Sequence, residues 1–409
     1  MQEHFTVYLL TKKAIMDNLL SKSQLKIKNV TTHFKRYLFS KINTKNKLIA
    51  ILGARGVGKT TLLLQLAKQQ HLKVMYIALD DLFFTRNTLY ELAEEFQQYG
   101  GKLLLLDEVH KYPNWSREIK LIYDDFPDLK VIFTSSSILD IYRGESDLSR
   151  RAVSYNLSAL SFREYLLFYE KIALPVLELN EILTNHSALS LGLLKKIKPI
   201  PYFKEFLKVG AYPYYKKHKI DYYQQIKNTV NLILDVDLQA VLPIDYNNVA
   251  KFKRLLYVIA TNVPFVPNIA KLSKQININR NTLVQALQLL EKAELIHALY
   301  KESNSVSVLN KPNKIWLRNT NLSYAISSEE VNSGNIRETF FIQHLNTFHK
   351  LALPAKGDFI IDETYTFEIG GKNKSQKQIQ GISNSYVVKD NIETGALNTI
   401  PLWLFGLMY

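Results

Sequence analysis

The feature that most constrains this chain is an apolar run that ends in a glycine-rich loop, LIAILGARGVGKTTLL at residues 48–63. The apolar run predicts a buried strand, and the residues after the loop have the spacing of a helix. Between them the sequence follows the pattern G-x-x-x-x-G-K-T on Gly53, Gly58, Lys59 and Thr60. A strand, this loop and a helix in that order predict a loop that binds phosphate.

The residue types of this loop predict how it would bind a nucleotide. Glycines let backbone N–H groups turn toward phosphate oxygens, and the amino end of the following helix favours negative charge. We expect Lys59 to bridge the β- and γ-phosphates of ATP and the Thr60 hydroxyl to bind Mg²⁺. Arg55 could contact phosphate or pair with an acid elsewhere. The predicted nucleotide-binding residues are Gly53, Arg55, Gly56, Gly58, Lys59, Thr60 and Thr61.

A second stretch, KLLLLDEVHKYPNW, places two acids at the end of another apolar run. Its leucines predict a buried strand that delivers Asp107 and Glu108 at its carboxyl end. We expect Asp107 to hold Mg²⁺ and Glu108 to act as the base that orients and activates water. The alternative is that both acids only cap the next helix. An acid directly after the Mg²⁺-binding aspartate favours hydrolysis of ATP over binding alone.

Two further positions are candidates for a catalytic role beside Glu108. The strand KVIFTSSSIL ends in hydroxyl side chains, of which Ser135 or Ser136 could sense the γ-phosphate. The same serines could instead cap the next helix. Arg151, in LSRRAVSYNL, could reach transition-state charge in its own subunit or in a neighbour's, or it could simply lie on the surface. The predicted catalytic set is therefore Glu108, Ser136 and Arg151.

Composition narrows the remaining possibilities. The chain has no cysteine, so it forms no disulfide and no Cys-ligated zinc site, which suits a reducing cytoplasm. The amino-terminal stretch lacks the apolar core of a signal peptide, and no apolar run is long enough to span a bilayer. We therefore expect a cytoplasmic protein without a membrane partner. The net charge of +15 is compatible with DNA as a partner, but AT-rich coding would give the same lysine-rich composition.

The order of the apolar patterns divides the chain into five predicted parts. An amphipathic helical leader comes first, and apolar runs alternating with helical stretches then predict a parallel α/β sheet. Helical patterns without strands follow, and a last segment again mixes strands with a helix. The predicted parts are a leader at 1–45, an ATPase domain at 46–165, a helical connector at 166–248, a winged helix at 249–325 and an α/β domain at 326–409.

Four stretches carry a family resemblance: GARGVGKTTLLLQLA, LLLLDEVHKYPNWSREIKLIYD, VIFTSSSIL and LSRRAVSYNLSALSFREYL. They resemble bacterial and archaeal AAA-type P-loop ATPases that end in a winged helix and a restriction-endonuclease-like domain. The resemblance implies ATP hydrolysis by a P-loop fold with an additional strand, and it implies that Glu108 is the base. It also matches Arg151 to an arginine that recurs in the family. The chain departs from the family at Arg150, where a glycine is usual, and at WLRNTNL, where an aspartate is usual.

The predicted winged helix lies in PNIAKLSKQININRNTLVQALQLLEKAELI, which has the pattern of a short helix, a turn and a longer helix. The longer helix would bury leucines on one side and present side chains that reach base edges or phosphates on another. Glu291 and Glu294 dilute the charge of that side, and winged helices also connect proteins. DNA and a protein are therefore both compatible partners. The candidate DNA contacts are Arg280, Asn281, Gln285 and Lys292.

The resemblance also implies a nuclease-like site in the last part of the chain. Nucleases of that fold hold Mg²⁺ with acids on two neighbouring strands, the second acid in the pattern E-x-K. Asp358 and Glu368 match these acids, and Glu338 matches a helical acid that accompanies them. Gly370 stands where the lysine belongs. We therefore expect a degenerate site, unless the Gly-Gly pair bends the strand so that Lys372 reaches back.

Three functions are compatible with these patterns. The first is an ATP hydrolase that couples hydrolysis of Mg-ATP to conformational change in a DNA- or protein-binding carboxy-terminal half, and it is our prediction. The second is a non-hydrolysing signalling switch that depends on bound nucleotide. The third is an ATP-gated, Mg²⁺-dependent nuclease. An oligomer is compatible with each of them.

Overall fold

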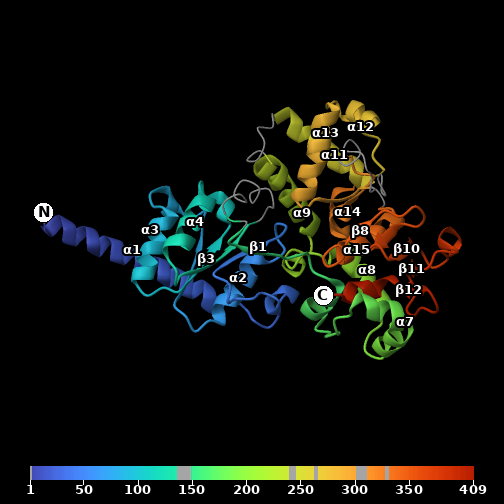
Figure 1. Ribbon diagram of the computed structural model, residues 1–409, viewed down its shortest axis with the longest axis horizontal. Helices are drawn as coiled ribbons and strands as arrows, with labels where there is room; N and C mark the ends of the chain where they lie inside the picture. Colours follow the sequence, from blue (N-terminus) through green and yellow to red (C-terminus); the bar gives the residue numbers. More distant parts are fainter. Residues whose placement is uncertain are drawn as a thin grey trace. The chain divides into compact units, whose positions relative to one another are not determined.

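The structure is a computed structural model that divides into two compact units, Met1–Ser158 and Ala159–Tyr409 (Figure 1). In the part of the chain that it describes, no helix is both long and apolar enough to cross a membrane. The described residues are 2–135, 148, 150–238, 246–261, 266–300, 311–327 and 331–409.

The first unit is built on a sheet of five parallel strands, which confirms the α/β prediction for this part of the chain. The strands lie in the order β2-β3-β4-β1-β5. β4 therefore lies between β1, which leads into the glycine-rich loop, and β3, which ends at the two acids. The strands are β1 Leu48–Leu52, β2 Val74–Ala78, β3 Leu103–Asp107, β4 Lys130–Thr134 and β5 Val153–Asn156.

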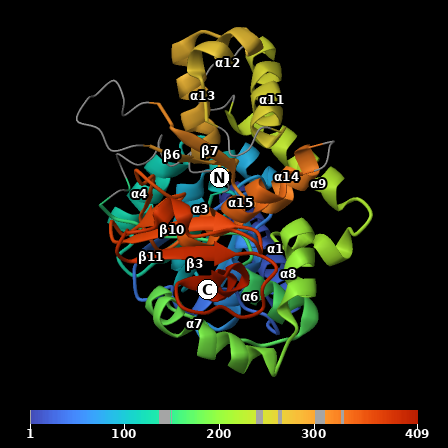
Figure 2. The same ribbon diagram turned by 90° about the vertical axis from the view of Figure 1, so that its right-hand side faces the viewer.

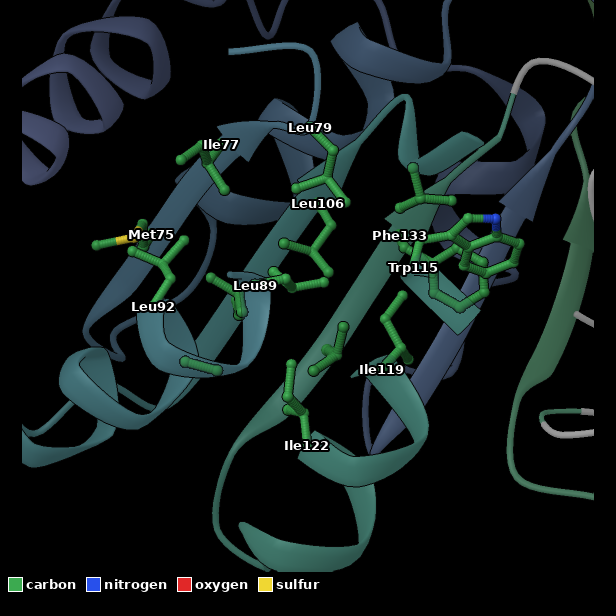
Figure 3. Close-up of a cluster of buried hydrophobic side chains, with 14 of the residues drawn as sticks. Met75, Ile77, Leu79, Leu89, Leu92, Leu106, Trp115, Ile119, Ile122 and Phe133 are labelled. Carbon is green, nitrogen blue, oxygen red and sulfur yellow. The ribbon is translucent and has the colours of Figure 1, made fainter. Parts of the chain in front are cut away.

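One face of this sheet is covered by α3 (Leu89–Gln98) and α4 (Trp115–Asp125), as Figure 3 shows. Every second residue of a strand points to the same face, so β1, β2, β3 and β4 each contribute alternate side chains to one buried cluster. A slip of one residue would turn these side chains to the other face, so the cluster fixes the register of the strands. Its members include Met75, Ile77, Leu106 and Phe133 from the strands and Leu89, Leu92, Trp115, Ile119 and Ile122 from the helices.

Two further helices complete the first unit. α2 (Lys59–Lys68) begins directly after the glycine-rich loop and packs against β2, β3 and β4. α1 (Gln2–Asn29), the predicted helical leader, packs against β2 at the edge of the sheet. The Ser23 hydroxyl of α1 accepts a hydrogen bond from the backbone N–H of Tyr76 at 2.8 Å. α1 thus pairs a backbone donor that an edge strand would otherwise leave to solvent.

The first part of the second unit is helical, as the lack of strand alternation predicts. α6 begins with a capping box, in which Ser161 and Glu164 each accept a hydrogen bond from the other's backbone N–H. α8 begins with Pro199, and a proline at this position removes no helical hydrogen bond. These helices are α6 Phe162–Tyr165, α7 Leu179–Leu194, α8 Pro199–Val209, α9 Tyr222–Leu232 and α11 Tyr246–Thr261.

Two helices joined by a short turn follow, next to α11 (Figure 2). α12 (Ile269–Ile276) ends at Asn277, whose positive φ of 53° turns the chain. α13 (Arg280–Lys292) begins at Asn279, whose side chain caps its first turn. The predicted short helix, turn and longer helix are therefore confirmed. The buried side of α13 is formed by Leu283, Ala286, Leu287 and Leu290, and the antiparallel strands β6 Ile296–Leu299 and β7 Lys314–Leu317 come next.

The last part of the second unit contains a mixed sheet in the order β12-β11-β10-β9-β8 (Figure 2). β8, β9 and β10 pair antiparallel, whereas β10, β11 and β12 pair parallel. α15 (Ser333–Leu345) packs against β10, and the ring of Phe341 contacts the rings of Phe359, Phe367 and Phe405. The other elements are α14 Thr320–Ile326, β8 Leu351–Ala352, β9 Phe359–Ile361, β10 Tyr365–Gly370, β11 Ser385–Lys389 and β12 Thr399–Pro401.

Candidate functional site

The glycine-rich loop has a backbone that only glycine adopts easily. Gly53 and Gly58 have φ angles of 144° and 101°, in the region that side chains disfavour. A Cβ atom on Gly53 would also clash with the backbone oxygen of Leu157, whose N–H donates to Leu52 at 2.8 Å. The loop is therefore pressed closely against the end of β5.

Lys59 is the most deeply placed cation of this loop. Its side chain is buried, and its Nζ donates to the backbone oxygens of Gly53 and Ala54 at 2.8 and 2.9 Å. The ammonium group thus lies inside the loop, where it donates to two backbone carbonyls. Gly56 and Thr61, also in the predicted set, lie at the tip of the loop and in the first turn of α2.

Arg36 supports the loop from outside it and was not predicted. Its buried guanidinium donates to the backbone oxygen of Val57 in the loop and, at 2.6 Å, to that of Ser158. Hydrogen bonds from a charged donor are about twice as strong as neutral ones. Nothing in the local sequence distinguishes this arginine from a surface residue. Its role arises only from folding.

Asp107 lies at the end of β3, buried and surrounded by hydroxyl groups. Its Oδ2 accepts from Thr60 Oγ1 at 2.7 Å and from the Tyr76 hydroxyl at 2.9 Å. Its Oδ1 accepts from Thr134 Oγ1. The structure therefore brings together Thr60 and Asp107, the two predicted Mg²⁺ ligands, and both offer the oxygen atoms that Mg²⁺ prefers.

Tyr76 is a second residue that sequence patterns missed. It lies on β2, beside β3, and burial together with the charge of Asp107 raises the pKa of its hydroxyl well above the usual value. The tyrosine therefore stays protonated and donates to the carboxylate. The sequence holds a weak signal for it, because VMYIAL is a buried strand with one polar atom that needs a partner.

Glu108 follows Asp107 in a left-handed backbone conformation, with φ of 53°. Its Oε2 lies 3.3 Å from His110 Nε2 and 3.8 Å from Arg55 Nη1. Burial raises the pKa of the Glu108 carboxyl, and the positive charges of Lys59 and Arg55 oppose that shift. Arg55 thus pairs with an acid, as one of its two alternatives predicts, and its contact with phosphate stays a prediction.

The predicted catalytic set has two further residues, Ser136 and Arg151. Ser136 falls outside the described residues. Thr134, the last residue of β4, contacts Asp107 and also accepts from the backbone N–H of Glu108 at 3.1 Å. Arg151 pairs with Asp124 of α4 at 3.0 Å. Arg151 precedes β5, which runs parallel to β1. It therefore lies near the amino ends of these strands, whereas the glycine-rich loop follows the carboxyl end of β1. A role for Arg151 in a neighbouring subunit stays a prediction.

The candidate DNA contacts share one surface of α13. Arg280, Asn281 and Gln285 are exposed, and Lys292 is partly exposed. The prediction that Glu294 dilutes this surface is wrong, because Glu294 is 5% exposed and pairs with Arg318 at 3.3 Å. α13 has already ended at residue 292, so helical spacing no longer applies to that position.

The three predicted nuclease-like acids come from different elements of the second unit and share two lysines. Lys314 Nζ lies 3.8 Å from Glu338 Oε2 and 3.7 Å from Asp358 Oδ1. Trp316 Nε1 also donates to Glu338 at 3.1 Å. We call Lys314, Glu338, Asp358, Glu368 and Lys374 the acid–lysine cluster. Among the described residues, no group of three or more His, Cys, Asp or Glu side chains is arranged to hold a metal ion.

The lysine that pairs with Glu368 is not the predicted Lys372. Lys372 is exposed, whereas Lys374 pairs directly with the buried Glu368. A Cβ atom on Gly370 would clash with the Cβ, Cγ and Cδ atoms of Lys374. The missing side chain at position 370 thus leaves room for a lysine that arrives from four residues further along.

Comparison with known proteins agrees with the geometry of the first unit. Residues 45–166 match a family described as an AAA domain, and residues 200–332 match a domain of unknown function (DUF8612). Together with the loop, the acids and the strand order, the first match supports an AAA-type P-loop ATPase domain in this part of the chain. An uncharacterized protein of Methanocaldococcus jannaschii is 28% identical over 375 residues, which are 82% of this chain and 78% of that protein.

Two solved structures are similar to parts of this chain. The Walker-type ATPase of Pyrococcus abyssi has a TM-score of 0.40 and 14% identity, covering 72% of this chain and 95% of that chain. AMPPCP-bound DnaA from Aquifex aeolicus has a TM-score of 0.26 and 17% identity, covering 62% and 84%. Both TM-scores are low, so the class of the domain rests on the family match and on the site itself.

Proposed function

We propose that the first unit binds Mg-ATP and hydrolyses it. The observation that carries this proposal is the contact of 2.7 Å between Thr60 Oγ1 and Asp107 Oδ2, beside the buried ammonium group of Lys59. Among the described residues, hydroxyl groups and no cation hold Asp107, so its negative charge would be available to a metal ion. The donor set therefore fits Mg²⁺ and phosphate.

Each residue would have a separate task in hydrolysis. Thr60 and Asp107 would hold Mg²⁺, which supplies positive charge to the phosphate oxygens when bound. Lys59 would exchange its two carbonyl contacts for phosphate oxygens. Glu108 would accept the proton of the attacking water. Tyr76 would fix the orientation of the Asp107 carboxylate.

Steady-state ATPase assays on two variants test this proposal. Lys59→Ala is expected to abolish nucleotide binding. Glu108→Gln is expected to bind ATP but to hydrolyse it at a rate at least about 100-fold lower than that of the wild type. Lys102→Ala is the matched control, because Lys102 makes only an exposed pair with Asp128 and such pairs contribute little. Turnover of the Lys59 variant at the control's rate would contradict the proposal.

For the second unit we propose that α12, α13, β6 and β7 form a winged helix that contacts DNA. The support is the exposed Arg280, Asn281 and Gln285 on α13, together with the burial of Glu294, which leaves their surface less acidic than the sequence suggests. Titration of labelled duplex DNA at several salt concentrations tests this. Arg280→Ala should weaken binding and reduce the salt slope by about one. A binding curve equal to that of the exposed-lysine control Lys219→Ala would favour a protein partner instead.

One observation supports a second candidate function, the ATP-gated nuclease. Lys374 supplies, from another position, the positive charge that Gly370 lacks. The lysines also neutralise the acids, so we place a structural or DNA-docking role first. The test is Mg²⁺-dependent cleavage of single- and double-stranded DNA with ATP, using Asp358→Ala and Glu368→Ala. If the wild type cleaved DNA and both substitutions removed this cleavage, the nuclease would take precedence over the structural or DNA-docking role.

A further inference from the structure

Three side chains from separate segments meet around the proposed catalytic base. Arg55 comes from the tip of the glycine-rich loop, Glu108 from the end of β3 and His110 from the turn η3 (Val109–Lys111). Their polar atoms lie within 4 Å of one another: 3.3 Å from His110 to Glu108, 3.8 Å from Arg55 to Glu108 and 3.4 Å from Arg55 to His110. We call these three residues the Glu108 cluster.

The Glu108 cluster is sheltered enough for its charges to matter. The side chains of Arg55, Glu108 and His110 are 15%, 25% and 4% exposed. Charges in such partly buried sites attract more strongly than exposed charges do. His110 Nε2 can either donate to Glu108 or accept from Arg55, but one nitrogen atom does not do both at once. In either tautomer the carboxylate keeps a positive or donor group beside it.

The position of Arg55 makes the cluster sensitive to phosphate. Arg55 lies between Gly53 and Gly58, so its backbone forms part of the phosphate-binding loop. A guanidinium group binds a phosphate through two parallel hydrogen bonds, as it binds a carboxylate. A terminal phosphate in this loop would therefore compete with Glu108 for the same guanidinium.

We infer that Arg55 and His110 hold Glu108 in a resting position, and that the γ-phosphate of ATP releases it by taking over Arg55. This inference rests on the proposed ATP hydrolysis and adds a regulatory step to it. The base becomes free only when its substrate is in place. Arg55 and His110 are positioning residues in this scheme, and Glu108 is the group that meets water.

Linkage gives a test that does not depend on turnover. If Glu108 and phosphate compete for Arg55, removing the Glu108 charge must strengthen binding of the phosphate by the same coupling. Equilibrium titration should therefore show a non-hydrolysable ATP analogue binding to Glu108→Gln about fivefold to tenfold more tightly than to the wild type. ADP, which lacks the γ-phosphate, should bind both proteins equally.

A double-mutant cycle separates this competition from simple repulsion between Glu108 and phosphate. In an Arg55→Ala background, Glu108→Gln should no longer change the affinity for the analogue. If Glu108→Gln raised the affinity for the analogue equally with and without Arg55, the inference would be overturned. Repulsion between Glu108 and phosphate would then explain the rise in affinity. Arg55→Lys, which keeps the charge, provides a second background should the alanine variant fold poorly.

His110 has its own matched pair of variants. His110→Leu removes the nitrogen that holds the carboxylate, so the analogue should bind more tightly, by a factor of about two to five, and KM for ATP should fall. His110→Gln keeps a donor and should remain near the wild type. Equal affinities for the leucine variant and the wild type would remove His110 from the scheme.

The same titrations distinguish failure of this inference from failure of the proposed function. If the wild type binds the analogue but does not hydrolyse ATP, the proposed hydrolysis is contradicted. The double-mutant cycle with Arg55 still tests the competition, because it measures binding alone. A protein that hydrolyses ATP with no coupling between Arg55 and Glu108 contradicts only the resting cluster. Absence of any nucleotide binding overturns both.

Discussion

The acids of the two charged sites in this chain have different kinds of partner. At the nucleotide site, Asp107 accepts hydrogen bonds from three neutral hydroxyl groups, so its charge is left for a cation to neutralise. In the acid–lysine cluster, Glu368 pairs with Lys374, while Glu338 and Asp358 share Lys314. An acid that already has an ammonium partner gains less from a metal ion. Both sites contain acids that the sequence predicts as metal ligands, but only the first presents them without a competing cation.

The largest predicted effect tests the first half of this comparison. Asp107→Asn keeps the shape of the side chain but removes the charge and replaces one acceptor oxygen by an amide donor. We expect Mg²⁺-dependent ATP turnover to fall about 1,000-fold, or roughly 4 kcal/mol, because the metal loses its anionic ligand. The measurement is steady-state hydrolysis across a range of Mg²⁺ concentrations. Turnover within tenfold of the wild type would place the metal elsewhere.

The next effect concerns pH and the acid–lysine cluster. Burial and the nearby charge of Asp358 raise the pKa of Glu338 to about 7, well above the usual 4.5 of a glutamate. The folded state therefore holds this proton more tightly than the unfolded chain does. The contribution to the free energy of unfolding is fully present below pH 4.5 and is lost as pH rises toward 7, by up to about 3 kcal/mol.

Urea unfolding of the wild type and Glu338→Gln at pH 5 and pH 7.5 measures this contribution. The glutamine variant cannot ionise, so it should lose less stability than the wild type between the two values. Thr347→Ala, a change in the turn after α15 that involves no carboxyl group, is the control. Parallel losses in all three proteins would mean that Glu338 stays ionised in the folded state.

A smaller effect follows from freeing one acid of the cluster. Lys374→Ala leaves the Glu368 carboxylate, which is 1% exposed, without its ion pair. We expect Mg²⁺ or Mn²⁺ to bind this variant about tenfold more tightly than the wild type, since the cation replaces the lost ammonium group. A cation-dependent rise in the thermal midpoint is the readout. Lys372→Ala, an exposed lysine two residues away, should behave as the wild type does.

The smallest effect probes the hydroxyl groups around Asp107. Tyr76→Phe removes one hydrogen bond to the carboxylate and leaves the charge of the site unchanged. A single hydrogen bond contributes about 1 kcal/mol, so the affinity for Mg-ATP should change by about fivefold or less. A loss as large as that of Asp107→Asn would show that Tyr76 does more than orient the acid.

The sequence predicts the nucleotide site well because that site is local. The loop and its lysine lie within eight consecutive residues, and Asp107 and Glu108 follow directly after a strand whose burial the leucines reveal. In a parallel sheet the carboxyl ends of all strands lie on the same side. The loop after β1 and the acid at the end of β3 are therefore close together, and Thr60 contacts Asp107. Arg36, Tyr76 and His110 were missed because each acts through a contact that no spacing encodes.

The acid–lysine cluster shows where such prediction ends. The three acids are named only through the family resemblance, and the lysine that pairs with Glu368 is Lys374 instead of Lys372 because of the path of the chain after Gly370. Lys314 lies on another strand, so no local pattern connects it with Glu338. Arg151 was ambiguous for a related reason, because only the register of β5 reveals at which edge of the sheet it lies.

The central claim is that Glu108 is the base of an ATP hydrolase. Single-turnover hydrolysis of ATP by the wild type and by Glu108→Gln, both saturated with Mg-ATP, tests it most directly. The account predicts that both proteins bind ATP and that only the wild type releases phosphate at an appreciable rate. Equal rates of phosphate release from the two proteins would contradict it.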